Sequence, residues 1–181
     1  PDAYLAQLQA AKLNDDVEVA HYAATAVAQI SKESDLKLQQ LERAFKTDPS
    51  AQNLIEYCDF LGEYLGSGLA EGRVAQIQRQ QYARLLARRC EREDTLELRI
   101  RYATALADVG QIDESQAVTN QLVLDVPEEQ EVWMLCLRLA VMRRDGDEVH
   151  RVIDAIDKQH VYLSADNREK LAFWRDGEEA R

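Results

Sequence analysis

Apolar residues recur at steps of three and four along residues 96–129, and this spacing places them on one face of a helix. In the first half of the stretch they are Leu98, Tyr102, Ala105, Leu106 and Val109. Gly110 interrupts the pattern, Asp113 can cap a second helix, and Pro127 ends it because proline donates no backbone hydrogen bond. The second helix carries its apolar residues at Ala117, Leu122 and Leu124. The stretch therefore predicts a pair of helices whose apolar side must be covered by further pairs.

The same periodicity predicts three helices at the start of the chain. We expect them over residues 2–13, over the alanine-rich residues 17–30 and over the more polar residues 31–46. Residues 14–16, Asn-Asp-Asp, would stop the first helix and cap the second. The apolar positions expected to face a core are Tyr4, Leu5, Leu8 and Leu13, followed by Leu36, Leu38, Leu41, Ala44 and Phe45.

Two more pairs and a last helix are predicted further along. Residues 52–65 and 69–90 form one pair, with a break at Gly66, Ser67 and Gly68. Its inward residues are expected to be Leu54, Tyr57, Cys58, Leu61 and Leu65, then Val74, Ile77, Tyr82, Leu85 and Leu86. Another pair runs from residue 130 to about residue 161, and Ser164 caps the last helix. That helix has apolar contacts at Leu171, Ala172, Phe173 and Trp174.

The composition favours an all-α protein. The chain has 181 residues, of which 46% are hydrophobic and 30% charged, with only three prolines and seven glycines. Helix-forming residues dominate, and alternating runs of Val, Ile and Thr are absent, so we expect no sheet. Three cysteines at Cys58, Cys90 and Cys136 lie within apolar helical patterns, which predicts buried free thiols.

Residues 96–129 resemble one tetratricopeptide repeat (TPR), a 34-residue helical hairpin with small residues at its eighth and twentieth places, a glycine at the turn and a proline near the end. Those places hold Ala103, Ser115, Gly110 and Pro127, whereas Arg99 stands where the family has tryptophan. The next copy, residues 130–163, has that tryptophan as Trp133, but Leu137 and Arg144 replace the small residue and the turn glycine.

Two weaker copies precede these, at residues 18–51 and at residues 52–95, the second enlarged by about ten residues near residues 66–75. The resemblance implies one domain over residues 1–181, built as a right-handed α-solenoid of helical hairpins. A capping helix over residues 164–176 would close it.

The charge of the chain restricts its partners. A net charge of −11 argues against nucleic acid, because phosphates would be repelled. Against this background, residues 73–101 hold eight arginines and only four acidic residues. This basic band could steer an acidic partner, or it could be an ordinary solvated helix face.

No catalytic or metal-binding constellation is recognisable, so we expect neither an enzyme nor a cofactor nor a metal site. The histidines His21, His150 and His160 lack zinc-ligand spacing, and His21 is expected to be a packed, hydrogen-bonded residue. The glycines at residues 66, 68 and 72 follow a helix, whereas a dinucleotide-binding loop follows a strand. Residues 145–148, Asp-Gly-Asp-Glu, read as a turn and the acidic start of a helix.

The TPR resemblance also implies a partner-binding groove, because the first helices of TPR hairpins line a concave surface. Carried over by position, the candidate residues are Asn53, Tyr57, Phe60 and Tyr64, then Arg101 and Thr104, and finally Met134, Arg138 and Met142. Such a groove would suit an amphipathic helix or an extended acidic peptide. Alternatively, the three aromatic residues belong to the core of a distorted repeat.

These features predict a non-enzymatic scaffold that binds another protein. Residues 20–86 further resemble the soluble part of membrane-anchored bacterial TPR proteins, the group that includes the PelE component of Pel exopolysaccharide export. This resemblance implies a cytoplasmic domain at the inner face of the membrane, with membrane segments before Pro1 and a partner among the membrane components of the exporter. The alternative is a regulatory helical domain that binds a small anionic ligand through residues 66–68 and the basic band.

Overall fold

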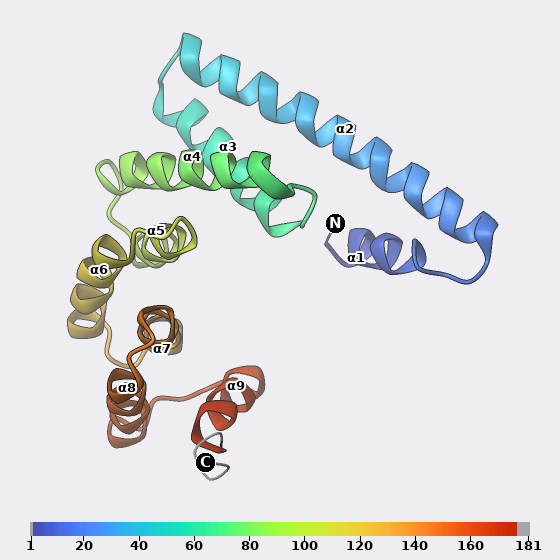
Figure 1. Cartoon of the computed structure of the whole chain (residues 1–181). Helices are drawn as coiled ribbons and strands as arrows, with labels where there is room; N and C mark the ends of the chain where they lie inside the picture. The colour runs from blue at the N-terminus through green and yellow to red at the C-terminus, as the bar shows by residue number, and fades with distance from the viewer. Residues whose placement is uncertain (1, 177–181) are drawn as a thin grey trace. The chain divides into compact units, whose positions relative to one another are not determined.

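A computed structural model describes residues 2–176 of the chain (Figure 1). These residues form nine α-helices and no strand, and the helices pack mostly against their neighbours in sequence, which confirms the all-α prediction. The helices are α1 (Asp2–Ala11), α2 (Val17–Thr47), α3 (Ala51–Gly66), α4 (Gly72–Cys90), α5 (Leu96–Asp108), α6 (Ile112–Asp125), α7 (Gln130–Arg143), α8 (Gly146–Lys158) and α9 (Ala165–Asp176). They fall into two compact units, divided between Arg89 and Cys90.

Helix α2 of the first unit is a single element of 31 residues, drawn as one unbroken ribbon in Figure 1. The predicted boundary between residues 30 and 31 is therefore wrong. Neither glycine nor proline stands there, so nothing interrupts the backbone hydrogen bonds, and α1 and α3 both pack against this long helix. The predicted start is confirmed, because Asp16 accepts hydrogen bonds from the backbone of Glu18 and Val19.

Side chains of α4 reach α3 at two places in the first unit. A Cβ atom placed on Gly62 would lie 2.7 Å from the hydroxyl of Tyr82, so only glycine leaves room for this ring. Next to this contact, Arg89 Nη1 lies 2.6 Å from Asp59 Oδ1. The predicted break after α3 is confirmed by Gly68, whose φ of 72° is in the left-handed region.

Several apolar residues predicted to face a core are instead exposed. Helix α4 begins at Gly72, three residues later than residue 69, and its first turns leave Val74 59% and Ile77 58% exposed. The same correction applies to Tyr4, Leu13, Leu36, Leu124 and Phe173, which are all exposed, and Ala44, Ala117 and Ala172 are exposed as well. His21 is also exposed, beside the ring of Tyr22, rather than packed.

The second unit contains two helical hairpins, α5–α6 and α7–α8, which pack against each other through α6–α7 and α5–α7. The first hairpin turns at Gly110, whose φ is 78°. The second turns at Arg144, which adopts a left-handed conformation with a φ of 58° although it is not glycine. The predicted cap at Asp113 is wrong, because Gln111 occupies the N-cap position and Asp113 forms an ion pair with Arg143.

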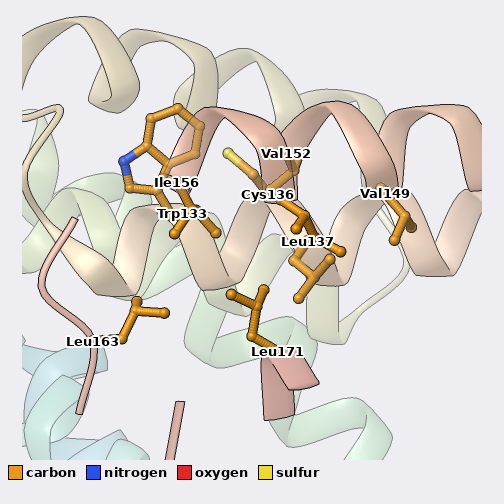
Figure 2. Packing of buried hydrophobic residues seen from close by; sticks show 10 residues of the cluster. Trp133, Cys136, Leu137, Val149, Val152, Ile156, Leu163 and Leu171 are labelled. Atoms are coloured by element: carbon orange, nitrogen blue, oxygen red, sulfur yellow. The ribbon is translucent and has the colours of Figure 1, made fainter. Parts of the chain in front are cut away.

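Helices α7, α8 and α9 enclose the larger of two apolar cores in this unit. Figure 2 shows Trp133, Cys136 and Leu137 of α7 facing residues of α8, with Leu163 and Leu171 closing the cluster from the chain that follows. A smaller core between α5, α6 and α7 contains Ala103, Ala107, Leu122, Val132, Leu135 and Leu139. The predicted cap of α9 is confirmed, since the amide of Asn167 donates to Ser164 Oγ.

Cys58 and Cys136 are buried as predicted, Cys90 is half-buried, and none of the three forms a disulfide. Among residues 2–176, no helix combines the length and the apolar character needed to cross a bilayer.

Candidate functional site

The first unit contains an apolar pocket of about 250 Å³ between α1, α2, α3 and the loop that follows α3. It is lined by Tyr4 and Leu5 from α1, Ile30 and Ser34 from α2, Phe60, Glu63 and Tyr64 from α3, and Ser67 and Leu69 from the loop. Tyr4 is 61% exposed, whereas Leu5 and Tyr64 are buried. The pocket is therefore open to solvent beside α1 and has buried side chains in its wall.

Hydrogen bonds hold one wall of this pocket in place. The hydroxyl of Tyr64 donates to Asp35 Oδ1 at 2.7 Å, which ties α3 to α2. Burial, together with Asp35, raises the pKa of Tyr64 to about 12, so the hydroxyl keeps its proton at neutral pH. The loop is fixed as well, because Ser67 Oγ donates to the carbonyl of Tyr64 and accepts from the amide of Leu69.

The lining chemistry selects the kind of group that can enter. Aromatic and aliphatic side chains form most of the wall, and Glu63 adds a carboxylate. Among the described residues, no arginine, lysine or histidine lines the pocket itself, and Lys37 Nζ lies over the ring of Phe60, 4.6 Å from its centroid. The pocket therefore suits an apolar side chain of a partner more than a charged metabolite.

The structure places the four predicted residues of α3 in two different environments. Phe60 and Tyr64 both line the pocket. Asn53 instead donates to the backbone carbonyl of Asp48 at 2.9 Å and so helps to hold the start of α3. Tyr57 is only 4% exposed and lies beside the ring of Phe45, with a centroid distance of 6.1 Å. Tyr57 is thus a core residue, which was the alternative reading of these aromatic side chains.

The predicted residues of α5 and α7 lie outside this pocket, in the second unit. Arg101 and Arg138 are each within salt-bridge distance of an acidic residue of the same unit, Glu97 and Asp108 respectively. Thr104 and Met134 are half-buried, and Met134 packs against the larger core. Met142 is 42% exposed.

A second hollow of about 380 Å³ lies in the second unit between α6, α7 and α8. It is lined by Gln116, Asn120, Val123, Leu124, Trp133, Cys136, Glu148, Arg151, Val152 and Ala155. None of the predicted site residues contributes to it. Burial raises the pKa of Cys136 to about 12, so its thiol stays protonated and is a poor nucleophile at neutral pH.

The pocket residues missed by the sequence analysis come from α1, from α2 and from the loop. The sequence pattern places Tyr4 and Leu5 on an apolar helix face, but no periodicity indicates which other helix such a face will meet. Ile30 and Leu69 lie outside the positions that the TPR resemblance assigns to a groove. The one available signal was the apolar helix preceding the first predicted repeat.

Within residues 2–176, no three His, Cys, Asp or Glu side chains are placed so that they could hold a metal ion together. Comparison of the chain with protein-family models, with curated proteins and with solved structures gave no match in any of the three.

Proposed function

We propose that this protein is a non-enzymatic scaffold for protein–protein interaction, and that the pocket between α1, α2 and α3 receives an apolar side chain of the partner. The observation that carries the proposal is the open, largely apolar lining of this pocket, held rigid by the bond between Tyr64 and Asp35. A pre-formed pocket is favourable for recognition, because little order has to be imposed when the partner binds.

The occupant is an amphipathic helix that inserts a Leu, Met or Phe side chain. Helices bind in this way when they present anchors at spacings of three and four residues to a hydrophobic groove. Burying one such side chain contributes about 1.5–3 kcal/mol, enough for one anchor to dominate a modest interface. Phe60 and Leu69 would contact this anchor directly, and Glu63 would contact its polar flank.

The architecture that we propose behind this function is a degenerate TPR-like right-handed α-solenoid. Support comes from the second unit, where α5–α6 and α7–α8 fall within the two predicted 34-residue ranges, 96–129 and 130–163. It also comes from Ala103 and Ser115, the two predicted small positions, which are both fully buried. Small residues at such positions allow neighbouring helices to approach closely.

For the cellular setting, we propose the cytoplasmic part of a membrane-associated bacterial assembly, such as one for exopolysaccharide biosynthesis or export. The support is the resemblance of residues 20–86 to membrane-anchored TPR proteins such as PelE. Fractionation of the full-length gene product tests this setting. It should appear in the inner-membrane fraction, and recovery in the soluble fraction alone would contradict the proposal.

The alternative, a regulatory domain for a small anionic ligand, has weaker support. Ser67 of the predicted ligand loop does border the pocket, but no arginine is among the described residues that line it. Thermal shift assays with nucleotides and acidic metabolites test this alternative, because a ligand that binds only the folded state raises the melting temperature.

Affinity capture with a pocket-filling variant tests the proposed function. Leu69→Trp enlarges a loop residue of the pocket wall and should block the anchor. Val19→Trp adds the same ring to an exposed position of α2 and serves as the matched control. A partner recovered with the wild type and with the control, but lost with Leu69→Trp, supports the proposal. Equal recovery with all three proteins contradicts it, provided that circular dichroism shows Leu69→Trp to be folded.

A further inference from the structure

Helix α4 has a charge unlike that of the rest of the protein. Its nineteen residues include five arginines and no Asp or Glu, whereas the whole chain has a net charge of −11. A local excess of one charge against a background of the other creates a field that attracts an oppositely charged partner.

The exposed side of α4 combines this charge with apolar side chains. Arg73, Ile77, Arg84 and Arg88 follow one another at steps of four, seven and four residues, which places them on one side of a helix with 3.6 residues per turn. Val74 lies beside them. We call these five residues the α4 stripe. All five are exposed, including Val74 at 59% and Ile77 at 58%, whereas the opposite side of α4 is buried.

Most of the charge on the stripe is not neutralised by the protein itself. Arg73 and Arg84 form no ion pair within residues 2–176, and Arg88 lies over the ring of Phe45, with its guanidinium carbon 5.8 Å from the ring centroid. Arg138 and Arg143 of the second unit, by contrast, pair with Asp108 and Asp113. Two guanidinium groups of the stripe therefore remain available to carboxylates of a partner.

The order of residues along the stripe specifies its occupant further. The two aliphatic side chains lie near the start of α4, next to Arg73, and the end of the stripe is purely cationic. A complementary helix would carry apolar residues at one end of its contact face and acidic residues at the other. Such an arrangement would attract the partner helix and would also determine its position and direction along α4.

We propose that the α4 stripe docks an acidic amphipathic helix of a partner protein. A bilayer is the less favourable occupant, because two aliphatic side chains without an aromatic residue bury little area in a membrane interface. Nucleic acid is less favourable too, because the acidic remainder of the chain would repel its phosphates. The inference rests on the proposed function, because it assumes that the partner is a protein. It concerns a different surface from the pocket, so the two can fail separately.

The experiment pans a displayed library of helical peptides, randomised at their surface positions, on the wild-type protein. Selected peptides are then measured by fluorescence anisotropy at two salt concentrations. The test variant is Arg73→Glu combined with Arg84→Glu. The matched control is Lys32→Glu combined with Arg43→Glu, which makes the same charge change at two exposed positions of α2. Leu69→Trp is measured in parallel to report on the pocket.

We expect the selected peptides to be acidic, to bind more weakly at high salt, and to lose roughly tenfold or more in affinity for the test variant, because each reversal replaces an attraction by a repulsion. Their affinity for the control and for Leu69→Trp should stay within about twofold of the wild type, since exposed charges away from an interface contribute little. A combined Val74→Ala and Ile77→Ala variant should also weaken binding while keeping its salt dependence.

Four results would overturn the inference. The first is that selected peptides are neutral or basic, or bind the test variant as tightly as the wild type. The second is that the wild type binds vesicles of phosphatidylglycerol and phosphatidylcholine, loses this binding in the test variant, and selects no acidic peptide. The third is concentration-dependent self-association that the test variant abolishes, which would assign the stripe to a second copy of the chain. Loss of peptide binding in Leu69→Trp alone would leave the pocket supported and contradict the stripe.

Discussion

The hydroxyl of Ser115 donates a 2.7 Å hydrogen bond to the backbone carbonyl of Ala103, and both residues are fully buried between α5 and α6. A carbonyl inside a helix already accepts the helical bond, so Ser115 uses its second lone pair. This contact joins two helices at a place where only small side chains fit.

Substitutions at Ser115 should separate the contribution of the hydrogen bond from that of the available space. Ser115→Ala should lower the free energy of unfolding by about 1 kcal/mol, because the lost bond leaves a carbonyl that still has its helical partner. Ser115→Leu should cost more, roughly 1–3 kcal/mol or above, because the extra volume forces α5 and α6 apart. Urea denaturation followed by circular dichroism measures both. Equal stability of Ser115→Leu and the wild type would contradict this packing.

Replacing Arg144 by glycine should stabilise the protein. Its φ of 58° costs a non-glycine residue about 1 kcal/mol, and its side chain forms no ion pair within residues 2–176. Arg144→Gly should therefore raise the free energy of unfolding by roughly 0.5–1 kcal/mol. The reciprocal control is Gly110→Ala, at a φ of 78°, which should lower it by a similar amount. A destabilised Arg144→Gly would show that this turn depends on the arginine side chain.

Gly62→Ala should destabilise the first unit, although alanine usually favours a helix. The new Cβ would lie 2.7 Å from the hydroxyl of Tyr82, so the ring or the helix must shift, at a cost of about 1–3 kcal/mol. Gly66→Ala is the matched control, because a Cβ there meets nothing within 4 Å, and it should be neutral or slightly stabilising.

A double-mutant cycle gives the mechanism behind the Gly62 effect. Tyr82→Phe removes the nearest atom and should recover part of the loss in the Gly62→Ala background. Additive effects of the two substitutions would show that the contact between α3 and α4 is not the cause.

The free energy of unfolding should fall at high pH because the folded state raises the pKa of two tyrosines. Burial raises the pKa of Tyr57 and of Tyr64 from the ordinary value of 10.0 to about 12. The folded state therefore holds these protons more tightly than the unfolded chain does. The resulting stabilisation is complete below pH 10 and is lost as the pH rises towards 12.

Urea unfolding of the wild type and of the Tyr57→Phe, Tyr64→Phe double variant at a series of pH values checks this dependence. The double variant should lose less stability per pH unit in that window, because it lacks the two shifted groups. Identical slopes would show that other groups whose pKa is raised by burial, such as Tyr102 and Cys136, account for the alkaline loss.

Several helix ends were predicted correctly from the sequence, although the boundary at residues 30 and 31 and the cap at Asp113 were not. Asp16, Ser164 and Pro127 act through local geometry, in which a side chain caps a nearby amide or a missing donor stops the helix. These effects need only a few residues of context. The breaks at Gly68 and Gly110 were predictable for the same reason, because the required backbone conformation favours glycine.

Burial was predicted less well, because it depends on elements far away in the sequence. Val74 and Ile77 fit an apolar helical pattern, yet both are exposed, and the periodicity of α4 alone cannot reveal this. The continuity of α2 was missed because a repeat pattern was extended across residues that contain no stop signal. Only some of the residues that line the pocket were predicted. Phe60 and Tyr64 came from the family resemblance, whereas Tyr4 and Ile30 depend on how α1 and α2 pack.

The most direct test of the scaffold proposal is photo-crosslinking in living cells, with the full-length protein carrying a benzophenone amino acid at Tyr4. This residue lines the pocket and is 61% exposed, so a probe there should reach a bound partner. The same probe at Tyr162, which is 78% exposed in the second unit, serves as the control. The account predicts one discrete crosslinked protein from position 4 that disappears in the Leu69→Trp background and is absent from position 162. The same products from both positions, or a product that persists in Leu69→Trp, would contradict it.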